Sequence, residues 1–158
     1  MFRFAARPAF LIRVVMFVGG LMAMPALAAE TASTQAGSPV GTWTTANGHG
    51  VVDIEQCGDA LCGRIVGIDR LAGDPMPTDV LGRPQCGLTI ITNQKAKVDG
   101  KWWGQITDPR DGGTYQAMIW VDQGGDLNLR GFIGIPQLGA TQIWHKFTGH
   151  LTNECRLV

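Results

Sequence analysis

From residue 41 onward, apolar and polar residues alternate in short runs that are separated by glycine-containing turns. Alternation with a period of two predicts β-strands, because successive side chains of a strand point to opposite faces. Asn47-Gly48 and Asp99-Gly100 are turn sequences of the kind that join antiparallel strands. The pattern predicts eight strands, at residues 41–45, 51–55, 61–68, 88–92, 101–107, 114–121, 126–133 and 141–147.

The predicted strands follow one another mainly through tight turns, and helical periodicity never extends beyond two turns after residue 28. Sequential antiparallel strands form a meander, and eight twisted strands can remove their exposed edges by closing. The predicted fold is therefore all-β, a small up-and-down antiparallel β-barrel, with a β-sandwich as the second possibility. The stretch Asp69–Gly87 is rich in proline and lacks periodicity, so we expect a long loop there that acts as a lid or binding loop.

The same alternation assigns each side chain to the inside or the outside of the barrel. Inward positions are mostly apolar, and Gly104 and Gly131 among them leave room either for strand bending or for a guest molecule. Inward aromatic rings either fill the core or line a ligand pocket, and the sequence leaves both possibilities open. The residues expected to line such a pocket are Trp43, Trp102, Ile106, Tyr115, Ile119, Leu129 and Trp144. Trp103 and Trp120 are expected to point outward, where tryptophan favours contact with a partner.

The first 28 residues have the organisation of a secretory signal peptide. Three arginines precede an apolar run, Val14–Met24, and Pro25-Ala26-Leu27-Ala28 places small residues where a signal peptidase reads. The apolar run is shorter than the roughly 20 residues that a membrane-spanning helix needs. We therefore expect cleavage near Ala28, a flexible lead-in over residues 29–38, and a single barrel domain over residues 39–158 in the periplasm or outside the cell.

Composition excludes several classes of function. Three of the 13 basic residues lie in the leader, which leaves a net charge of −3 and argues against nucleic acid or anionic membranes as partners. Only Ser33 and Ser38 remain as serines after the leader, and they lie in the lead-in, so a serine nucleophile is not expected. His49, His145 and His150 lack metal-site spacing, and Asp108 and Asp111 are more typical of a turn than of acid–base catalysis. We predict no catalytic residues, no metal and no cofactor.

Four cysteines, Cys57, Cys62, Cys86 and Cys155, remain in the exported chain. An even number in this setting predicts disulfides. Cys57 and Cys62 enclose a tight turn between two strands, which favours a bridge between them and leaves Cys86 for Cys155. Four cysteines allow three connectivities, and the sequence does not choose among them.

Gly41-Thr42-Trp43 resembles the G-x-W motif that opens the barrels of lipocalins and other calycins. In those proteins a late arginine or lysine packs over the tryptophan and closes one end of the barrel, with cation–π attraction as the physical reason. Lys146 would fill this role here. Lysine stacks less well than arginine.

A more specific resemblance extends over nearly all of the chain after the leader. Its motifs are Gly41-x-Trp43, Cys57–Val66, Cys86-Gly87-Leu88, Asp108-Pro109 with Gly113-Thr114-Tyr115, Arg130–Pro136, and Gly139-x-Thr141-Gln142-x-Trp144. These residues are similar to the bacterial exported family called domain of unknown function 2147. The chain departs from it at Phe132, where the family often has tyrosine, and at Lys146, where it often has arginine. The resemblance implies a calycin-like barrel and export, and it implies no established activity.

Two functional hypotheses follow. The first is a non-catalytic periplasmic barrel that binds a small apolar or amphipathic molecule, such as a fatty acid, with the long loop as a lid. The alternative is an envelope protein-interaction module, an inhibitor or an assembly factor, that uses Trp103 and Trp120. An enzyme is a distant third, because the usual catalytic constellations are missing from the sequence.

Overall fold

The structure is a computed structural model that describes residues 37–97 and 99–158. The predicted leader and most of the lead-in, through residue 36, lie outside the described residues. The described chain forms eight strands and one short 3₁₀ helix: β1 (Gly41–Thr44), β2 (Gly50–Cys57), β3 (Ala60–Ile68), β4 (Thr89–Ala96), β5 (Trp102–Thr107), β6 (Thr114–Val121), β7 (Leu127–Phe132), η1 (Pro136–Leu138) and β8 (Ala140–Lys146).

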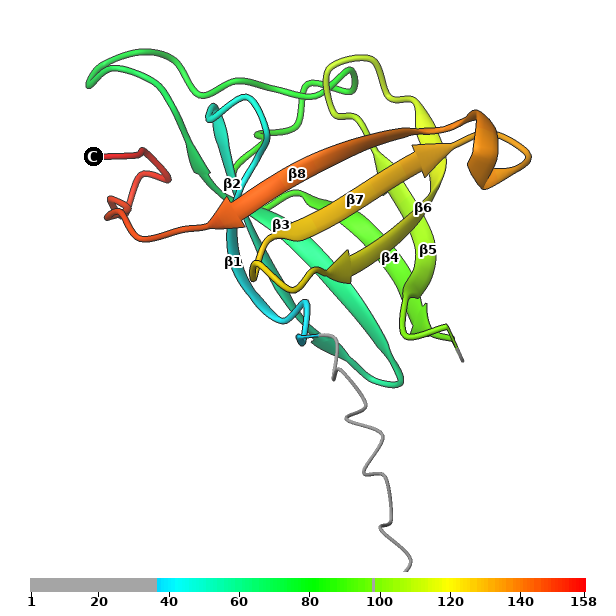
Figure 1. The fold of residues 1–158 in the computed structure, drawn as a ribbon. Helices are drawn as coiled ribbons and strands as arrows, with labels where there is room; N and C mark the ends of the chain where they lie inside the picture. Colours follow the sequence, from blue (N-terminus) through cyan, green and yellow to red (C-terminus); the bar gives the residue numbers. More distant parts are fainter. Residues whose placement is uncertain (1–36, 98) are drawn as a thin grey trace, which may run out of the picture. The chain divides into compact units, whose positions relative to one another are not determined.

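The strands close into an antiparallel barrel in the order β1 to β8, so the predicted up-and-down barrel is confirmed and the sandwich is wrong (Figure 1). Each strand pairs with the next one along the chain, and β1 closes the ring by pairing with β8 through Trp43↔Lys146 and Thr44↔His145. Closure leaves no exposed sheet edge among the eight strands, which is the usual way for a small all-β protein to avoid edge pairing.

The largest error in a predicted strand boundary concerns β4, which continues to Ala96 rather than ending at Thr92. The register between β4 and β5 shifts between Thr92 and Lys95, and Asn93 adopts a left-handed φ of 54°. A bulge of this kind lets a strand bend and continue through polar residues. A Cβ at Gly104 would lie 2.5 Å from the carbonyl oxygen of Thr92, so this glycine permits close backbone approach at the bend.

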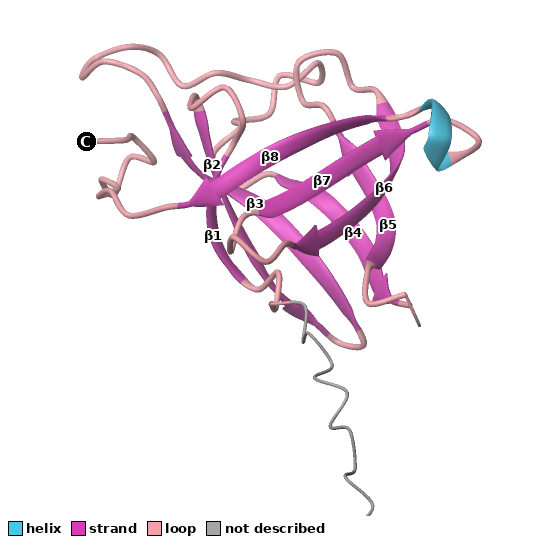
Figure 2. Cartoon of the chain, viewed as in Figure 1, coloured by secondary structure: helices cyan, strands magenta, loops and turns pink. Residues whose placement is uncertain are grey.

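Antiparallel order sorts the connections between two ends of the barrel (Figure 2). We call the end that carries the β1–β2, β3–β4, β5–β6 and β7–β8 connections the open end. The end that carries the β2–β3, β4–β5 and β6–β7 connections is the closed end. Among the described residues, no helix combines the length and apolar content needed to cross a membrane.

The main core fills the closed half of the barrel. Its most deeply buried large side chains are those of Trp43, Ile54, Leu61, Ile91, Ile119 and Leu127. Trp43 also satisfies its only polar atom, because its indole Nε1 donates to the carbonyl oxygen of Pro39 at 2.8 Å. Burying large aromatic and branched side chains together is the principal stabilising contribution to a domain of this size.

Both disulfides favoured by the sequence are present, Cys57–Cys62 and Cys86–Cys155. The first bridges the β2–β3 hairpin at the closed end. The second ties the long β3–β4 connection to the C-terminal segment, which itself runs beside β3 through the hydrogen bonds Ile68 N→Cys155 O at 2.8 Å and Leu157 N→Ile68 O at 3.2 Å. The long loop is therefore anchored at its C-terminal side.

Trp103 and Trp120 lie on the outer wall but are half-buried rather than free. The ring of Trp103 packs edge-on against Phe132, with centroids 5.9 Å apart. The ammonium group of Lys101 lies 4.8 Å from the ring centroid of Trp120. Both tryptophans therefore bury part of their apolar surface in contacts within the chain.

Candidate functional site

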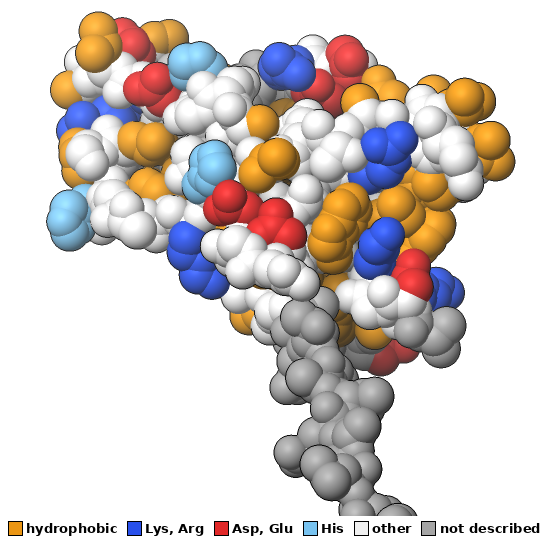
Figure 3. Space-filling view, viewed as in Figure 1, with side chains coloured by type: hydrophobic (Ala, Val, Ile, Leu, Met, Phe, Trp, Pro, Cys, Tyr) orange, Lys and Arg blue, Asp and Glu red, His pale blue; other side chains and the backbone are white. Residues whose placement is uncertain are grey.

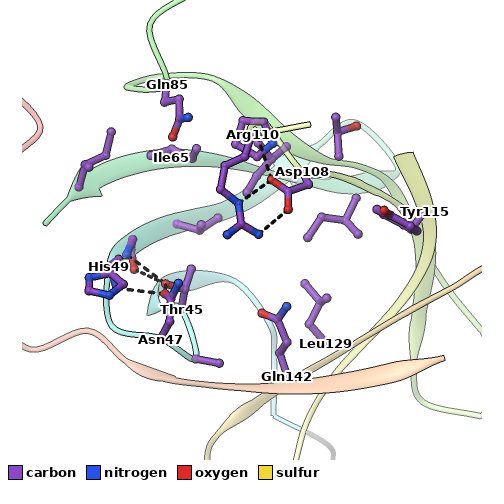
Figure 4. A pocket seen from close by; sticks show the side chains of 18 residues that line it. Thr45, Asn47, His49, Ile65, Gln85, Asp108, Arg110, Tyr115, Leu129 and Gln142 are labelled. Carbon is purple, nitrogen blue, oxygen red and sulfur yellow. Dashed lines mark hydrogen bonds and ion pairs between the residues drawn. The ribbon is translucent and has the colours of Figure 1, made fainter. Parts of the chain in front are cut away.

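A cavity of about 590 Å³ opens at the open end of the barrel (Figure 4). Every strand from β2 to β8 contributes at least one wall residue, namely Val52, Ile65, Ile68, Ile90, Ile106, Tyr115, Leu129 and Gln142. Six of these eight are aliphatic, and the two polar ones, Tyr115 and Gln142, come from β6 and β8. The wall is thus predominantly apolar, with few hydrogen-bonding groups.

The hollow exists because of side-chain size. The closed half of the barrel holds the indole rings of Trp43 and Trp144 beside its aliphatic side chains, whereas the wall of the cavity contains isoleucine, leucine and valine but no tryptophan. Smaller side chains on strands of the same spacing leave the barrel axis unfilled. No tryptophan lines the cavity, and five of its aliphatic wall residues belong to the same buried cluster as Trp43 and Trp144: Val52, Ile65, Ile68, Ile90 and Leu129.

A polar rim surrounds the mouth of the cavity. From the β1–β2 turn come Thr45, Asn47 and His49, and the Thr45 hydroxyl donates to Asn47 Oδ1 at 2.9 Å. His49 Nδ1 lies 3.0 Å from Asp69 Oδ2, which joins this turn to the start of the β3–β4 connection. The rim is therefore cross-linked by hydrogen bonds between neighbouring connections.

The β5–β6 turn supplies the most strongly charged part of the rim. Arg110 Nε donates to Asp108 Oδ1 at 3.0 Å, and Arg110 Nη2 donates to Asp108 Oδ2 at 2.6 Å. The hydrogen bond from Arg110 is the main reason why the pKa of Asp108 is lowered from its ordinary value. The same contact raises the pKa of Arg110, so both groups are charged across the physiological range.

Gln142 links the cavity to the packed core beneath it. Its Oε1 accepts a hydrogen bond from Trp144 Nε1 at 3.0 Å, which leaves the amide nitrogen without a part in this contact. Leu129 faces Gln142 across β7 and β8, so the two side chains share the inner face. The wall at this point offers an amide donor beside an aliphatic surface.

The residues that the sequence nominated for ligand contact divide into two groups. Ile106, Tyr115 and Leu129 line the cavity. Trp43, Ile119 and Trp144 are buried in the core beneath it, and Trp102 packs against that core while half-buried. Three of the seven nominated side chains thus reach the cavity, and the inward tryptophans serve the packing of the closed half.

The long loop does not form the expected lid. Gln85 is the part of Asp69–Gly87 that lines the cavity, and the rest of the loop is absent from its lining. A Cβ at Gly112 would lie 2.9 Å from Val80 Cγ2, so the loop rests against the β5–β6 turn. The residues that border the mouth come instead from the β1–β2 and β5–β6 turns.

Sequence reasoning missed the cavity residues Ile65, Ile90, Arg110 and Gln142. The two isoleucines could have been predicted from the sequence, because inward-facing residues close to the turns of the open end lie at the level of the cavity. Arg110 could have been found in another way. It lies in a turn at the same end of the barrel, two residues after Asp108, the acidic residue with which the turn begins.

Lys146 lies over Trp43, with Nζ 4.4 Å from the ring centroid. A Cβ at Gly41 would come within 3.2 Å of Lys146 Nζ, and Gly41 has a φ of 135°. The glycine of the G-x-W motif therefore allows both the backbone conformation and the passage of the lysine side chain. The geometry is that of a cation covering the indole ring at the closed end.

The clusters of potential metal ligands have other partners. Glu55, Cys57 and Cys62 lie within reach of one another, but the two sulfur atoms are joined in a disulfide and offer no thiolate. His145 Nδ1 lies 2.9 Å from Asp126 Oδ1 at the closed end. Neither arrangement is a set of open metal ligands.

Comparison with known proteins agrees with this architecture. The family model described as "Uncharacterized protein conserved in bacteria (DUF2147)" matches residues 41–146. No curated protein matches the chain. Among solved structures, the chain is similar to protein HP1028 from the human pathogen Helicobacter pylori, which is described as belonging to the lipocalin family. The TM-score is 0.60 at 15% identity, over 70% of this chain and 84% of that one, a likeness of fold.

Proposed function

Since the chain belongs to the bacterial family DUF2147 and its barrel is hollow at one end, we propose that it is an exported, non-catalytic protein that binds a small apolar or amphipathic molecule. The observation that carries the proposal is the cavity, with a wall drawn from seven strands, five of which contribute aliphatic side chains, and with its polar rim. A volume of about 590 Å³ falls within the range of roughly 300–1,000 Å³ typical of small-molecule sites.

The distribution of polarity supports an amphipathic ligand. Aliphatic side chains line the depth of the cavity, and hydrogen-bonding groups gather at its mouth. A molecule with an apolar tail and a polar end would bury the tail and keep the polar end near water, which avoids the cost of desolvating a polar group without a partner.

The state of the titratable groups supports a binding role rather than catalysis. Asp108 and His49 border the cavity, and each is hydrogen-bonded to a partner from the same end of the barrel. A general acid at neutral pH needs a raised pKa, whereas that of Asp108 is lowered by Arg110. Export is supported by the two disulfides, since such bonds persist outside the cytoplasm, and by the leader-like residues 1–28.

Titration with lauric acid and dodecanol, followed by tryptophan fluorescence and calorimetry, tests the proposal. We expect saturable 1:1 binding of at least one probe. Leu129→Trp places an indole in the cavity and should weaken binding at least tenfold. Ile143→Trp is the matched control, because Ile143 lies on the same sheet but is 48% exposed on the outer face of β8. Failure of both probes to bind, with no lipid in native mass spectra of protein purified from the periplasm, would overturn the proposal.

A second candidate, a protein-interaction module, is favoured by one observation. Three large apolar side chains in the β7–β8 connection are highly exposed: Ile133 (75%), Ile135 (53%) and Leu138 (79%). Figure 3 shows hydrophobic side chains gathered at that end of the molecule. Arg130 holds the loop in place, with Nε donating to the carbonyl oxygen of Pro136 at 2.7 Å. An ordered apolar protrusion is a more suitable contact surface than the half-buried Trp103 and Trp120.

This candidate is tested by capture from periplasmic extract with the native protein and with the double variant Ile133→Ser, Leu138→Ser. Trp103→Ala and Trp120→Ala serve as comparison variants. Loss of one defined partner with the loop variant alone supports the interaction module, and equal capture by all four proteins counts against it.

A further inference from the structure

The guanidinium of Arg110 has an unused donor edge at the mouth of the cavity. Asp108 occupies the Nε–Nη2 edge through two hydrogen bonds, 3.0 and 2.6 Å long. Guanidinium has five N–H donors, so both N–H groups of Nη1 and one of Nη2 remain. Within residues 37–97 and 99–158, no acceptor is hydrogen-bonded to these three N–H groups. Figure 4 shows the Arg110 side chain reaching over the cavity from the β5–β6 turn.

The turn that carries Arg110 is held by several hydrogen bonds of its own. Asp108 N donates to the carbonyl oxygen of Gly113 at 2.8 Å, and Gly112 N donates to that of Asp108 at 2.8 Å. Asp108 Oδ1 also accepts from the backbone N–H of Arg110 at 2.9 Å. The Arg110 side chain is 76% exposed, yet its bidentate contact with the 25% exposed Asp108 fixes its direction. The free edge is therefore presented in one orientation without a cost in side-chain ordering on binding.

We propose that the cavity selects an amphipathic ligand with a carboxylate head, which binds the free edge of Arg110 while the apolar tail lies against Ile106 and Leu129. This inference rests on the proposed binding function and specifies its ligand class. Guanidinium has donors and no acceptor, so the head must be an acceptor. A carboxylate matches two parallel N–H groups, which a hydroxyl or a single carbonyl does not.

The local charges limit how strong the selection is. Asp108 already balances the charge of Arg110, and Asp111 lies close enough to raise the pKa of Arg110 as well. Net attraction of an anion is therefore weak, and the preference comes from paired hydrogen bonds to a charged donor, which are stronger than hydrogen bonds between neutral groups. A cationic head is disfavoured for a different reason, because both oxygens of Asp108 are already engaged by Arg110.

The experiment compares laurate with dodecanol, which share a twelve-carbon chain and differ in the head, at a pH where laurate is ionised. In the native protein we expect laurate to bind about tenfold more tightly, since tenfold corresponds to about 1.4 kcal/mol. Arg110→Gln should weaken laurate about tenfold and leave dodecanol unchanged. Arg110→Lys should recover part of the difference, because an ammonium group cannot pair with both oxygens in a fixed plane. Arg64→Gln, an exposed arginine on the outer face of β3, is the matched control and should bind both probes as the native protein does.

The outcomes separate this inference from the proposed function. Equal affinity of the native protein for laurate and dodecanol overturns the carboxylate selection and leaves the binding function standing. An equal loss of both probes in Arg110→Gln also overturns it, and assigns Arg110 to holding its own turn. If neither probe binds the native protein, both proposals fail together.

Discussion

In the closed half of the barrel, tryptophans and large aliphatic side chains from facing strands bury one another almost completely, whereas in the open half the same alternation of strands surrounds a cavity. The two halves share strands, register and closure. They differ in the volume of the inward side chains and in what lies at the end, a lysine over a tryptophan at one and hydrogen-bonded turns at the other. The comparison teaches that one continuous sheet can hold its stabilising core at one end of the barrel and a cavity for binding at the other.

The largest expected difference between the halves is the response to truncation. Trp43→Ala should lower the free energy of unfolding by about 5 kcal/mol, the upper end for a buried aromatic, because both its packing and its hydrogen bond to Pro39 are lost. Leu129 is also buried, but it borders an existing cavity, so Leu129→Ala should cost about 2 kcal/mol, the lower end for a buried leucine. Urea denaturation followed by far-UV circular dichroism measures both.

Similar losses for the two variants would contradict the division into halves. Ile143→Ala, on the outer face of β8, is the control for general sensitivity of the barrel and should change stability by less than about 0.5 kcal/mol.

The two disulfides provide the next contrast. Cys86 and Cys155 are separated by 69 residues and Cys57 and Cys62 by 5. In the chain-entropy description, replacing the first pair by serine should lower stability by about 4 kcal/mol and replacing the second by about 2 kcal/mol. Denaturation of the two double variants under the same conditions gives the comparison. A larger loss from the Cys57–Cys62 pair would show that the short hairpin bridge, rather than the anchored long loop, limits unfolding.

The sequence predicted the strands well because each has a strong local signal. Alternation located all eight, and turns such as Asn47-Gly48 set most of their ends. The end of β4 was not predicted, because its continuation past Thr92 depends on the left-handed conformation of Asn93 and on the space left by Gly104 on the neighbouring strand. That contact forms between two strands, so the sequence pattern of either strand alone does not predict it.

The candidate site was less predictable for a geometric reason. Alternation assigns Trp43, Ile119 and Leu129 to the same inner face but does not give their height along the barrel axis, which depends on the stagger between strands. All three belong to the buried core cluster, but Leu129 also lines the cavity, whereas Trp43 and Ile119 do not. Arg110 was hidden for another reason, because a turn residue carries no periodic signal and its direction is set by Asp108.

Replacing a buried amide is expected to raise the stability of the protein, whereas the substitutions above lower it. Gln94 is fully buried and pairs in register with the core residue Leu61, yet its Oε1 has no hydrogen-bond partner and its Nε2 reaches Gln105 O only at 3.4 Å. Gln94→Leu keeps a similar volume and removes the unsatisfied group, so it should stabilise the protein by about 1 kcal/mol. Thermal and urea denaturation report the change.

Gln116→Leu on the exposed face of β6 is the control, and it should leave stability within about 0.5 kcal/mol of the native value. A loss of stability in Gln94→Leu would mean that the amide of Gln94 has a partner, such as an ordered water, that makes it an integral part of the wall.

The smallest effect concerns the cation that covers the closed end. Lys146→Ala should lower stability by about 0.5–1 kcal/mol, the range for an exposed cation–π pair, and Lys146→Arg should restore it because guanidinium stacks on aromatic rings. Stability alone would not distinguish this contact from the one between Lys101 and Trp120 on the outer wall. Exchange of the Trp43 indole N–H, followed by NMR, makes the distinction, since that group is buried against Pro39 beneath Lys146. If Lys146 covers the end of the barrel, the indole N–H should exchange faster in Lys146→Ala but not in Lys101→Ala. Unchanged exchange in both variants would mean that packing alone protects this N–H from solvent.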